Sequence, residues 1–170
     1  MSKVTGRLAD GEQGAAEAAP RFFLVDVFVV RWAPAGAWEA LVLRRASGRS
    51  PGSWEAVHGH VEPGERPEEA AWREAIEETG LTPERLYNLS RAESFYLHRL
   101  GAVAVVPAFA AVMGDGALQL SHEHDAWEWL PLDEARARFS WPRCRRGLAD
   151  LEVMLADGTA GVLEDTLRVR

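Results

Sequence analysis

Three glutamates in the acidic stretch between positions 67 and 79 have a spacing that could bring their carboxylates together. In a helix, at about 100° per residue, Glu74, Glu77 and Glu78 share one face about a quarter of a turn wide. Glu74 and Glu78 are like charges four residues apart, which costs about 0.2–0.5 kcal/mol in an isolated helix. Only Glu77 has a basic partner along the helix, Arg73. Converging carboxylates with so few basic partners indicate a hard divalent cation, and Mg²⁺ commonly bridges such carboxylates to substrate phosphates.

The residues around these glutamates suit a metal site. Gly59 lets the loop backbone come close, so its carbonyl oxygen could be a further ligand. Glu65 stands at the junction of loop and helix, where a carboxylate can brace the loop or a nearby basic side chain. Ala70 and Ala71 are small, and we expect them to leave room for metal and phosphate.

The segment from Gly59 to Leu81 reads GHVEPGERPEEAAWREAIEETGL and resembles the Nudix box, G-x5-E-x7-R-E-U-x-E-E-x-G-U with U an aliphatic residue. All eight fixed positions match: Gly59, Glu65, Arg73, Glu74, Glu77, Glu78, Gly80 and Leu81. Ala75, at the first U, is small but apolar, and His60 replaces a glycine that many members have. A motif with so many required residues is specific, unlike a lone GxGxxG.

The resemblance implies an α/β fold, a Nudix α/β/α sandwich with a mixed β-sheet. It also implies water attack on a phosphorus of a nucleoside diphosphate derivative, assisted by Mg²⁺, for which Mn²⁺ can substitute. Carried over to this chain, Glu74, Glu77 and Glu78 would bind metal together with the Gly59 carbonyl. Glu74 would also activate water, and Arg73 would orient Glu74 and Glu77.

Outside the box, the sequence is more weakly similar to the dihydroneopterin triphosphate and dATP pyrophosphohydrolase branch. The residues that carry this similarity are Leu41–Arg45, Ser53-Trp54, Ser94–Tyr96, Ser121–Leu130 and Ser140-Trp141. We therefore expect a nucleoside triphosphate-like substrate and release of pyrophosphate.

Other activities within the superfamily remain alternatives. ADP-ribose and dinucleoside polyphosphates are other possible substrates. A nucleotide-sensing module that binds without cutting would usually have a degenerate box, whereas this box is intact. The isopentenyl diphosphate isomerase branch needs a cysteine early in the fold, whereas Cys144 lies late in this chain.

Several residues outside the box are candidates for binding substrate. Arg44 and Arg45 end a predicted strand, and one of them could clamp phosphate through its planar fork; the alternative is a surface pair. Phe95 and Tyr96 point to opposite faces of their strand, and we favour Tyr96 as the ring that stacks on a base. Trp141 is a candidate for a second ring wall.

A histidine-flanked glutamate, Glu123, is the last candidate. His122 and His124 suggest a transition metal, but neighbouring residues point apart and no further Cys or His completes a tetrahedral site. We interpret Glu123 as an additional acid near the Mg²⁺ ions, on a loop that orders when Mg²⁺ and nucleotide bind. The alternative is an exposed acidic loop.

The helices and strands that position these residues are predicted from the pattern of apolar residues and from the glycines and prolines that end each element. Strands are predicted over Phe22–Trp32, Trp38–Arg45, Trp54–Val57, Leu86–His98, Gly101–Val112 and Ala126–Leu130. Helices are predicted over Pro67–Thr79, Leu132–Phe139 and Arg145–Ala156. This order favours a mixed sheet with helices on both faces.

Composition and charge narrow the class of protein further. The chain of 170 residues has a formal net charge of −7, which disfavours a nucleic acid polymer as partner. The basic cluster Arg143-Cys144-Arg145-Arg146 fits a small phosphorylated ligand better. A single cysteine and the lack of a long apolar run favour a cytoplasmic protein without membrane contact. We expect a flexible tail over residues 1–20 and one domain over 21–170, and a homodimer is possible because dimers are common in the family.

Overall fold

The computed structural model describes residues 24–98 and 101–170, so the predicted tail over residues 1–20 lies outside it. The strands are β1 (Leu24–Trp32), β2 (Trp38–Arg45), β3 (Trp54–Glu55), β4 (Val57–His60), β5 (Arg85–Leu97), β6 (Ala102–Val112) and β7 (His124–Pro131). The helices are α1 (Pro67–Thr79), α2 (Leu132–Arg138), α3 (Pro142–Met154), a short 3₁₀ turn (Gly161–Leu163) and α4 (Glu164–Leu167). Within the described residues, no helix is long and apolar enough to cross a membrane.

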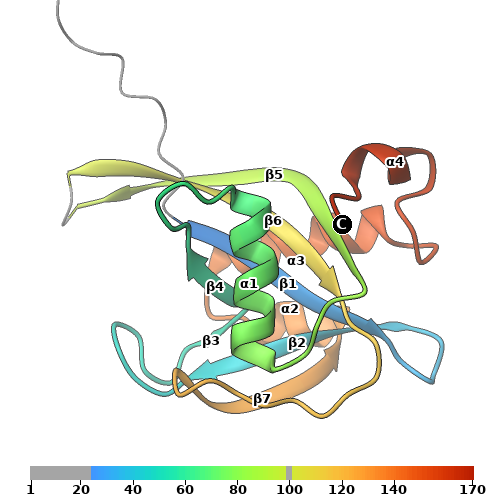
Figure 1. Cartoon of the computed structure of the whole chain (residues 1–170). Coiled ribbons are helices and arrows are strands. Elements are labelled where there is room, and N and C mark those ends of the chain that lie inside the picture. The colour runs from blue at the N-terminus through green and yellow to red at the C-terminus, as the bar shows by residue number, and fades with distance from the viewer. Residues whose placement is uncertain (1–23, 99–100) are drawn as a thin grey trace, which may run out of the picture.

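The seven strands form one mixed sheet that divides at β1 (Figure 1). Near its end, at Val30–Trp32, β1 pairs with β2, whereas its first residues, Leu24–Val27, pair with β4. On its other side β1 runs parallel to β6, which in turn pairs with β5. β2 and β4 pair with the same side of β1 but at different residues, and they do not pair with each other. The sheet is therefore open between these two strands.

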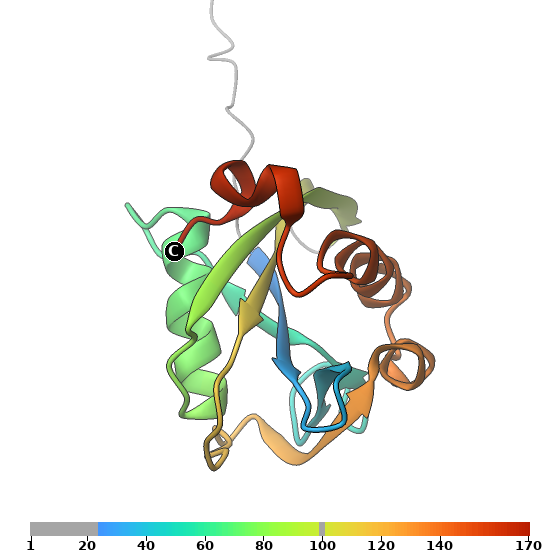
Figure 2. The same cartoon turned by 90° about the vertical axis from the view of Figure 1, so that its right-hand side faces the viewer.

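Alternate residues of β1 build two cores on opposite faces of the sheet. Val25, Val27 and Val29 pack with the buried alanines of α1. Phe28 and Val30 face the other way, in the core that contains residues of α2 and α3. Figure 2 shows the resulting layers, with α1 on one side of the sheet and α2 and α3 on the other. The predicted α/β/α arrangement is confirmed.

Helix α1 has the predicted bounds because its ends are stabilised locally. Pro67 occupies the first turn, and the Glu69 carboxylate accepts a hydrogen bond of 2.9 Å from the Arg66 backbone N–H. At the other end Gly80 has φ 70°, and its N–H donates to the Ile76 carbonyl. One expectation for this helix is wrong, because Ala70 and Ala71 do not leave space for a ligand. They are fully buried where α1 packs on the sheet.

Two segments differ from the sequence-based prediction. The strand predicted over Trp54–Val57 is divided into β3, which pairs with β2, and β4, which pairs with β1 and extends to His60, so Gly59 belongs to a strand and not to a loop. The last residues of the chain, for which no element was predicted, lie along β5. Leu86 donates its N–H to the Arg170 carbonyl, and Val169 donates to the Leu86 carbonyl. The Arg170 guanidinium also stacks 4.3 Å from the ring centre of Trp72 on α1.

Helix α3 can approach the sheet because Gly147 lacks a side chain. A Cβ at Gly147 would lie 2.4 Å from Cζ of Phe28, whose buried ring packs edge-on against Phe139. We expect Gly147→Ala to lower the free energy of unfolding by about 1–3 kcal/mol through overpacking. Urea unfolding of the variant measures this change. Val153→Ala, an exposed site on the same helix, is the control and should lie within about 0.5 kcal/mol of the parent; equal stabilities for both variants would contradict this packing.

Candidate active site

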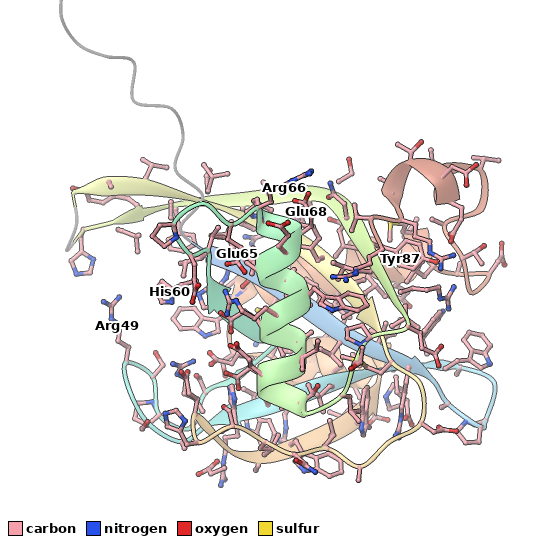
Figure 3. All side chains as sticks on the ribbon, in the orientation of Figure 1. Arg49, His60, Glu65, Arg66, Glu68 and Tyr87 are labelled. Carbon is pink, nitrogen blue, oxygen red and sulfur yellow. The ribbon has the colours of Figure 1, made fainter. Side chains whose placement is uncertain are left out.

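The Arg73 guanidinium joins the helix, the loop before it and the end of β4. It donates two hydrogen bonds of 2.9 Å to Glu65, one of 2.8 Å to Glu74 and one of 3.1 Å to Glu77. It also donates to the backbone carbonyl of His60 at 2.8 Å. The hydrogen bonds to Glu65 raise the pKa of Arg73 well above its ordinary value. Figure 3 shows Glu65 beside the first turns of α1 and His60 farther out, toward the loop that carries Arg49.

Glu74 lies directly against the backbone of β4. A Cβ at position 59 would be 1.9 Å from the Glu74 Cδ, so only glycine allows this approach. Burial raises the pKa of Glu74; Arg73 opposes this rise, and the charges of Glu77 and Glu78 add to it. The structure thus brings Gly59, Arg73, Glu74 and Glu77 together, while the Glu77 side chain stays 55% exposed.

Glu78 is held separately and more deeply. Its Oε2 accepts hydrogen bonds from His124 Nδ1 at 2.7 Å and from the Ser121 hydroxyl at 2.6 Å. Burial by itself would raise the pKa of Glu78, but these two donors and the His124 charge lower it. Burial likewise opposes protonation of His124, yet its contacts with Glu55 and Glu78 raise the pKa of that imidazole to about 9.

Arg45 continues this network on the other side of Glu55. It donates to Glu55 at 3.0 Å and to Glu123 at 2.7 Å. Glu55 also accepts a hydrogen bond from the Trp141 indole at 3.2 Å. Glu123, predicted to act near the metal, therefore has an arginine as its partner.

A cavity of about 750 Å³ lies next to this network, where the sheet divides. Its lining combines apolar and aromatic side chains with four arginines and two histidines, against two glutamates. The residues are Leu24, Arg45, Gly48, Arg49, Ser50, Glu55, His58, His60, Glu93, Ser94, Phe95, Leu97, Trp141, Pro142, Arg143 and Arg146. A volume of this size suits a ligand as large as a nucleotide.

A buried ion cluster fixes one wall of the cavity. Arg143 donates to Asp26 at 2.9 Å, and His58 Nδ1 lies 2.6 Å from the other Asp26 oxygen. Burial would raise the pKa of Asp26, but His58 and Arg143 together lower it. The Arg143 guanidinium lies 5.7 Å from the ring centre of Phe95 and 5.2 Å from that of Trp141. The cluster thus presents a cation between two rings.

The structure separates the predicted substrate residues into two groups. Arg45 and Trp141 line the cavity. Arg44 points away and pairs with Asp125 at 2.7 Å on the surface. The preference for Tyr96 is not supported, because its side chain is 64% exposed and Phe95 lines the cavity instead. The two rings alternate across β5, and the Phe95 side of that strand faces α3.

Sequence reasoning missed several residues of this region. Asp26 and Glu55 are single acids within apolar strands, and such buried charges are retained when they are paired. That pattern could have indicated a paired site, although not its partners. Arg143 and Arg146 belong to the basic cluster that was noted, but their place in the cavity depends on how α3 packs. His124 was considered only as one of two histidines that could bind a transition metal, and the sequence did not indicate its contact with Glu78.

The donor chemistry at α1 fits a hard divalent cation. Glu74, Glu77 and Glu78 offer carboxylate oxygens, and the Gly59 backbone, against which Glu74 packs, offers a carbonyl. As the side chains stand in residues 24–98 and 101–170, no group of three His, Cys, Asp or Glu converges in a metal-holding arrangement. Glu77 is turned to Arg73 and Glu78 to His124, so these two would exchange partners or share them when a cation binds. The metal-binding role of these residues stays a prediction.

Comparisons with known proteins identify the family. The NUDIX domain family model matches residues 22–151, and the chain belongs to this family, as the box predicted. The rat bis(5'-nucleosyl)-tetraphosphatase [asymmetrical] is 42% identical over 85 residues, which is 48% of this chain and 58% of that enzyme. The match therefore spans little more than half of that relative.

Solved structures agree with this assignment. A binary complex of the C. elegans Ap4A hydrolase has a TM-score of 0.65 and 29% identity, covering 79% of this chain and 97% of that one. The E. coli dihydroneopterin triphosphate pyrophosphohydrolase has a TM-score of 0.60 and 25% identity, covering 81% and 100%. Nudix hydrolases generally use a divalent metal, in agreement with the donor chemistry at α1.

The different surroundings of Glu74 and Glu78 predict opposite effects on stability in metal-free buffer. The lowered pKa of Glu78 means that its ionised form stabilises the fold above its ordinary pKa, so at pH 7 this stability is present. Glu78→Gln removes that contribution and should cost about 1–3 kcal/mol of unfolding free energy. Glu74 has a raised pKa, so Glu74→Gln should leave stability unchanged or slightly higher.

Urea unfolding at pH 7 with a chelator tests this pair of variants. Relief of the like-charge repulsion along the helix would by itself leave the Glu74→Gln, Glu77→Gln and Glu78→Gln variants at least as stable as the parent. The structure changes that expectation for Glu78 only, because of its two hydrogen-bond donors. A stability loss for Glu74→Gln that equals or exceeds the loss for Glu78→Gln would contradict this assignment.

Proposed function

We propose that this protein hydrolyses a phosphoanhydride bond in a nucleoside 5′-polyphosphate with the aid of Mg²⁺. The observation that carries the proposal is the complete Nudix box beside a cation-lined cavity. Within the box, Arg73 ties Glu65, Glu74 and Glu77 to the end of β4. When bound by these carboxylates, Mg²⁺ would supply an activated water and neutralise phosphate charge.

The chain's own residues would bind and orient the substrate. Arg45 and Arg49 lie at the rim formed by the end of β2 and the following loop, and their planar groups suit phosphate oxygens. Phe95, Trp141 and the Arg143 guanidinium offer flat faces to a base. An excess of basic groups in the cavity of an acidic chain supports an anionic ligand of nucleotide size.

Two substrates of this class are candidates. A nucleoside or pterin triphosphate, cut to a monophosphate and pyrophosphate, is the first and follows from the similarity outside the box. A dinucleoside tetraphosphate is the second, and the relatives named as asymmetrical tetraphosphatases favour it. ADP-ribose is a weaker candidate, because neither the sequence outside the box nor these relatives favour it.

A substrate panel separates these candidates. ATP, dATP, dihydroneopterin triphosphate, diadenosine tetraphosphate and ADP-ribose would be incubated with Mg²⁺, with Mn²⁺ and with a chelator, and the products separated by chromatography. We expect turnover with either metal and none with the chelator. Glu74→Gln should lower kcat at least about 10²-fold, because a metal-held nucleophile is worth several kcal/mol. Glu68→Gln, on the same helix, is the matched control and should remain active.

The outcomes of the panel decide between the candidates. Cleavage of diadenosine tetraphosphate without triphosphate cleavage would establish the second substrate and exclude the first. Turnover that is independent of metal, or full activity in Glu74→Gln, would overturn the proposal itself. A homodimer and a cytoplasmic location remain predictions that these assays do not address.

Glu123 gives a further prediction for this site. Arg45 pairs with its carboxylate, and a phosphate that bound Arg45 would free Glu123 to approach a metal at α1. We expect Glu123→Gln to lower kcat and to shift the Mg²⁺ concentration needed for half-maximal rate, with no loss of folding because the side chain is 41% exposed. Asp125→Asn is the control, since Asp125 pairs with the surface residue Arg44. Equal kinetics for Glu123→Gln and the parent would show that Glu123 is an exposed acid with no part in the reaction.

A further inference from the structure

His124 is a buried imidazole that connects two carboxylates on different elements. It begins β7, beside a register shift between Arg44 and Arg45 on β2. Its side chain is only 2% exposed, while the next residue, Asp125, is exposed on the surface. A strand position turned into the core normally holds an apolar residue, because a buried polar group is costly unless it is paired. The histidine at this position therefore needs a physical reason.

The two ring nitrogens of His124 have different partners. Nδ1 lies 2.7 Å from Glu78 Oε2, which also accepts from Ser121. Nε2 points toward Glu55 Oε1 at 3.6 Å, which is beyond hydrogen-bond distance. Among the residues that the structure describes, this nitrogen is the only buried side-chain nitrogen or oxygen that has no hydrogen-bond partner. Only the contact with Glu78 is thus fully formed.

This contact fixes one of the two Glu78 oxygens and leaves the other available. Both donors reach Oε2, so Oε1 is the oxygen that Glu78 can offer to a cation. A carboxylate that is held in one rotamer by hydrogen bonds loses less freedom when it binds a metal, and such supporting partners commonly contribute 10–100-fold in metal affinity. Within the described residues, Glu78 has no arginine partner comparable to Arg73, which holds Glu74 and Glu77.

We propose that His124 is a positioning residue that holds Glu78 ready to bind a divalent cation, through the hydrogen bond from Nδ1. The proposal rests on the proposed function, because it takes Glu78 as a metal ligand. The same imidazole also faces Glu55, whose carboxylate accepts hydrogen bonds from Arg45 and Trp141. His124 therefore lies between helix α1 and the wall of the cavity. His124 itself does not touch the reacting atoms.

Binding of Mn²⁺, measured by electron paramagnetic resonance without any nucleotide, tests the proposal. Two polar variants separate the nitrogens: the amide of His124→Asn can replace Nδ1, whereas the longer amide of His124→Gln replaces Nε2. We expect His124→Asn to bind Mn²⁺ within about threefold of the parent and His124→Gln to bind about 10–100-fold more weakly. His122→Gln, in the exposed turn before β7, is the matched control and should bind as the parent does.

A second step asks whether the effect passes through Glu78. In the Glu78→Gln background, His124→Gln should cause no further loss of Mn²⁺ affinity, because residues that act together are not additive. Additive losses, or equal affinities for His124→Gln and the parent, would overturn the inference and leave the metal site standing. Failure of the parent to bind Mn²⁺, or unchanged binding by Glu78→Gln alone, would instead overturn the proposed metal site and the inference with it.

Discussion

The arrangement of α1 depends on one guanidinium, that of Arg73, which donates hydrogen bonds to three carboxylates. Without Arg73, Glu65, Glu74 and Glu77 would repel one another at the junction of loop, helix and strand. Because the same group also binds the His60 carbonyl, it fixes the end of β4 against the helix. Gly59 can then lie against Glu74, and His58 and His60 of β4 line the cavity.

Two kinds of electrostatic environment therefore meet in this site. Along α1, the carboxylates outnumber their cations, and burial, together with the charges of Glu77 and Glu78, raises the pKa of Glu74. In the cavity, cations outnumber acids, and those acids that remain, Glu55 and Glu93, are each bound by arginine. The proposed substrate, a polyphosphate chain with its metal ions, would complement both halves at once, because the cations would bind the helix carboxylates and the phosphates would bind the arginines.

The residues within and next to each element were sufficient to predict most helices and strands and the Nudix box. The limits of α1 follow from Pro67 and Gly80, and the buried strands from their continuous runs of apolar residues. The remainder depends on contacts between distant residues. Alternation placed Phe95 and Tyr96 on opposite faces, but only the packing of α3 decides which face holds the cavity. In the same way Glu78 and His124 meet across 46 positions, and no local pattern near either one indicates that contact.

The C-terminal segment packs on the Nudix domain although it lies beyond the residues that the family model matches. The family match ends at residue 151, yet Arg170 stacks on Trp72 of α1, and Glu164 binds the buried Tyr87 hydroxyl at 2.9 Å. These last residues also cover the backbone of β5 at Leu86, an edge strand that would otherwise present free hydrogen-bonding groups to other chains. A chain shortened at residue 151 would thus expose the edge of β5 and lose the contact between Arg170 and the helix that carries the Nudix box.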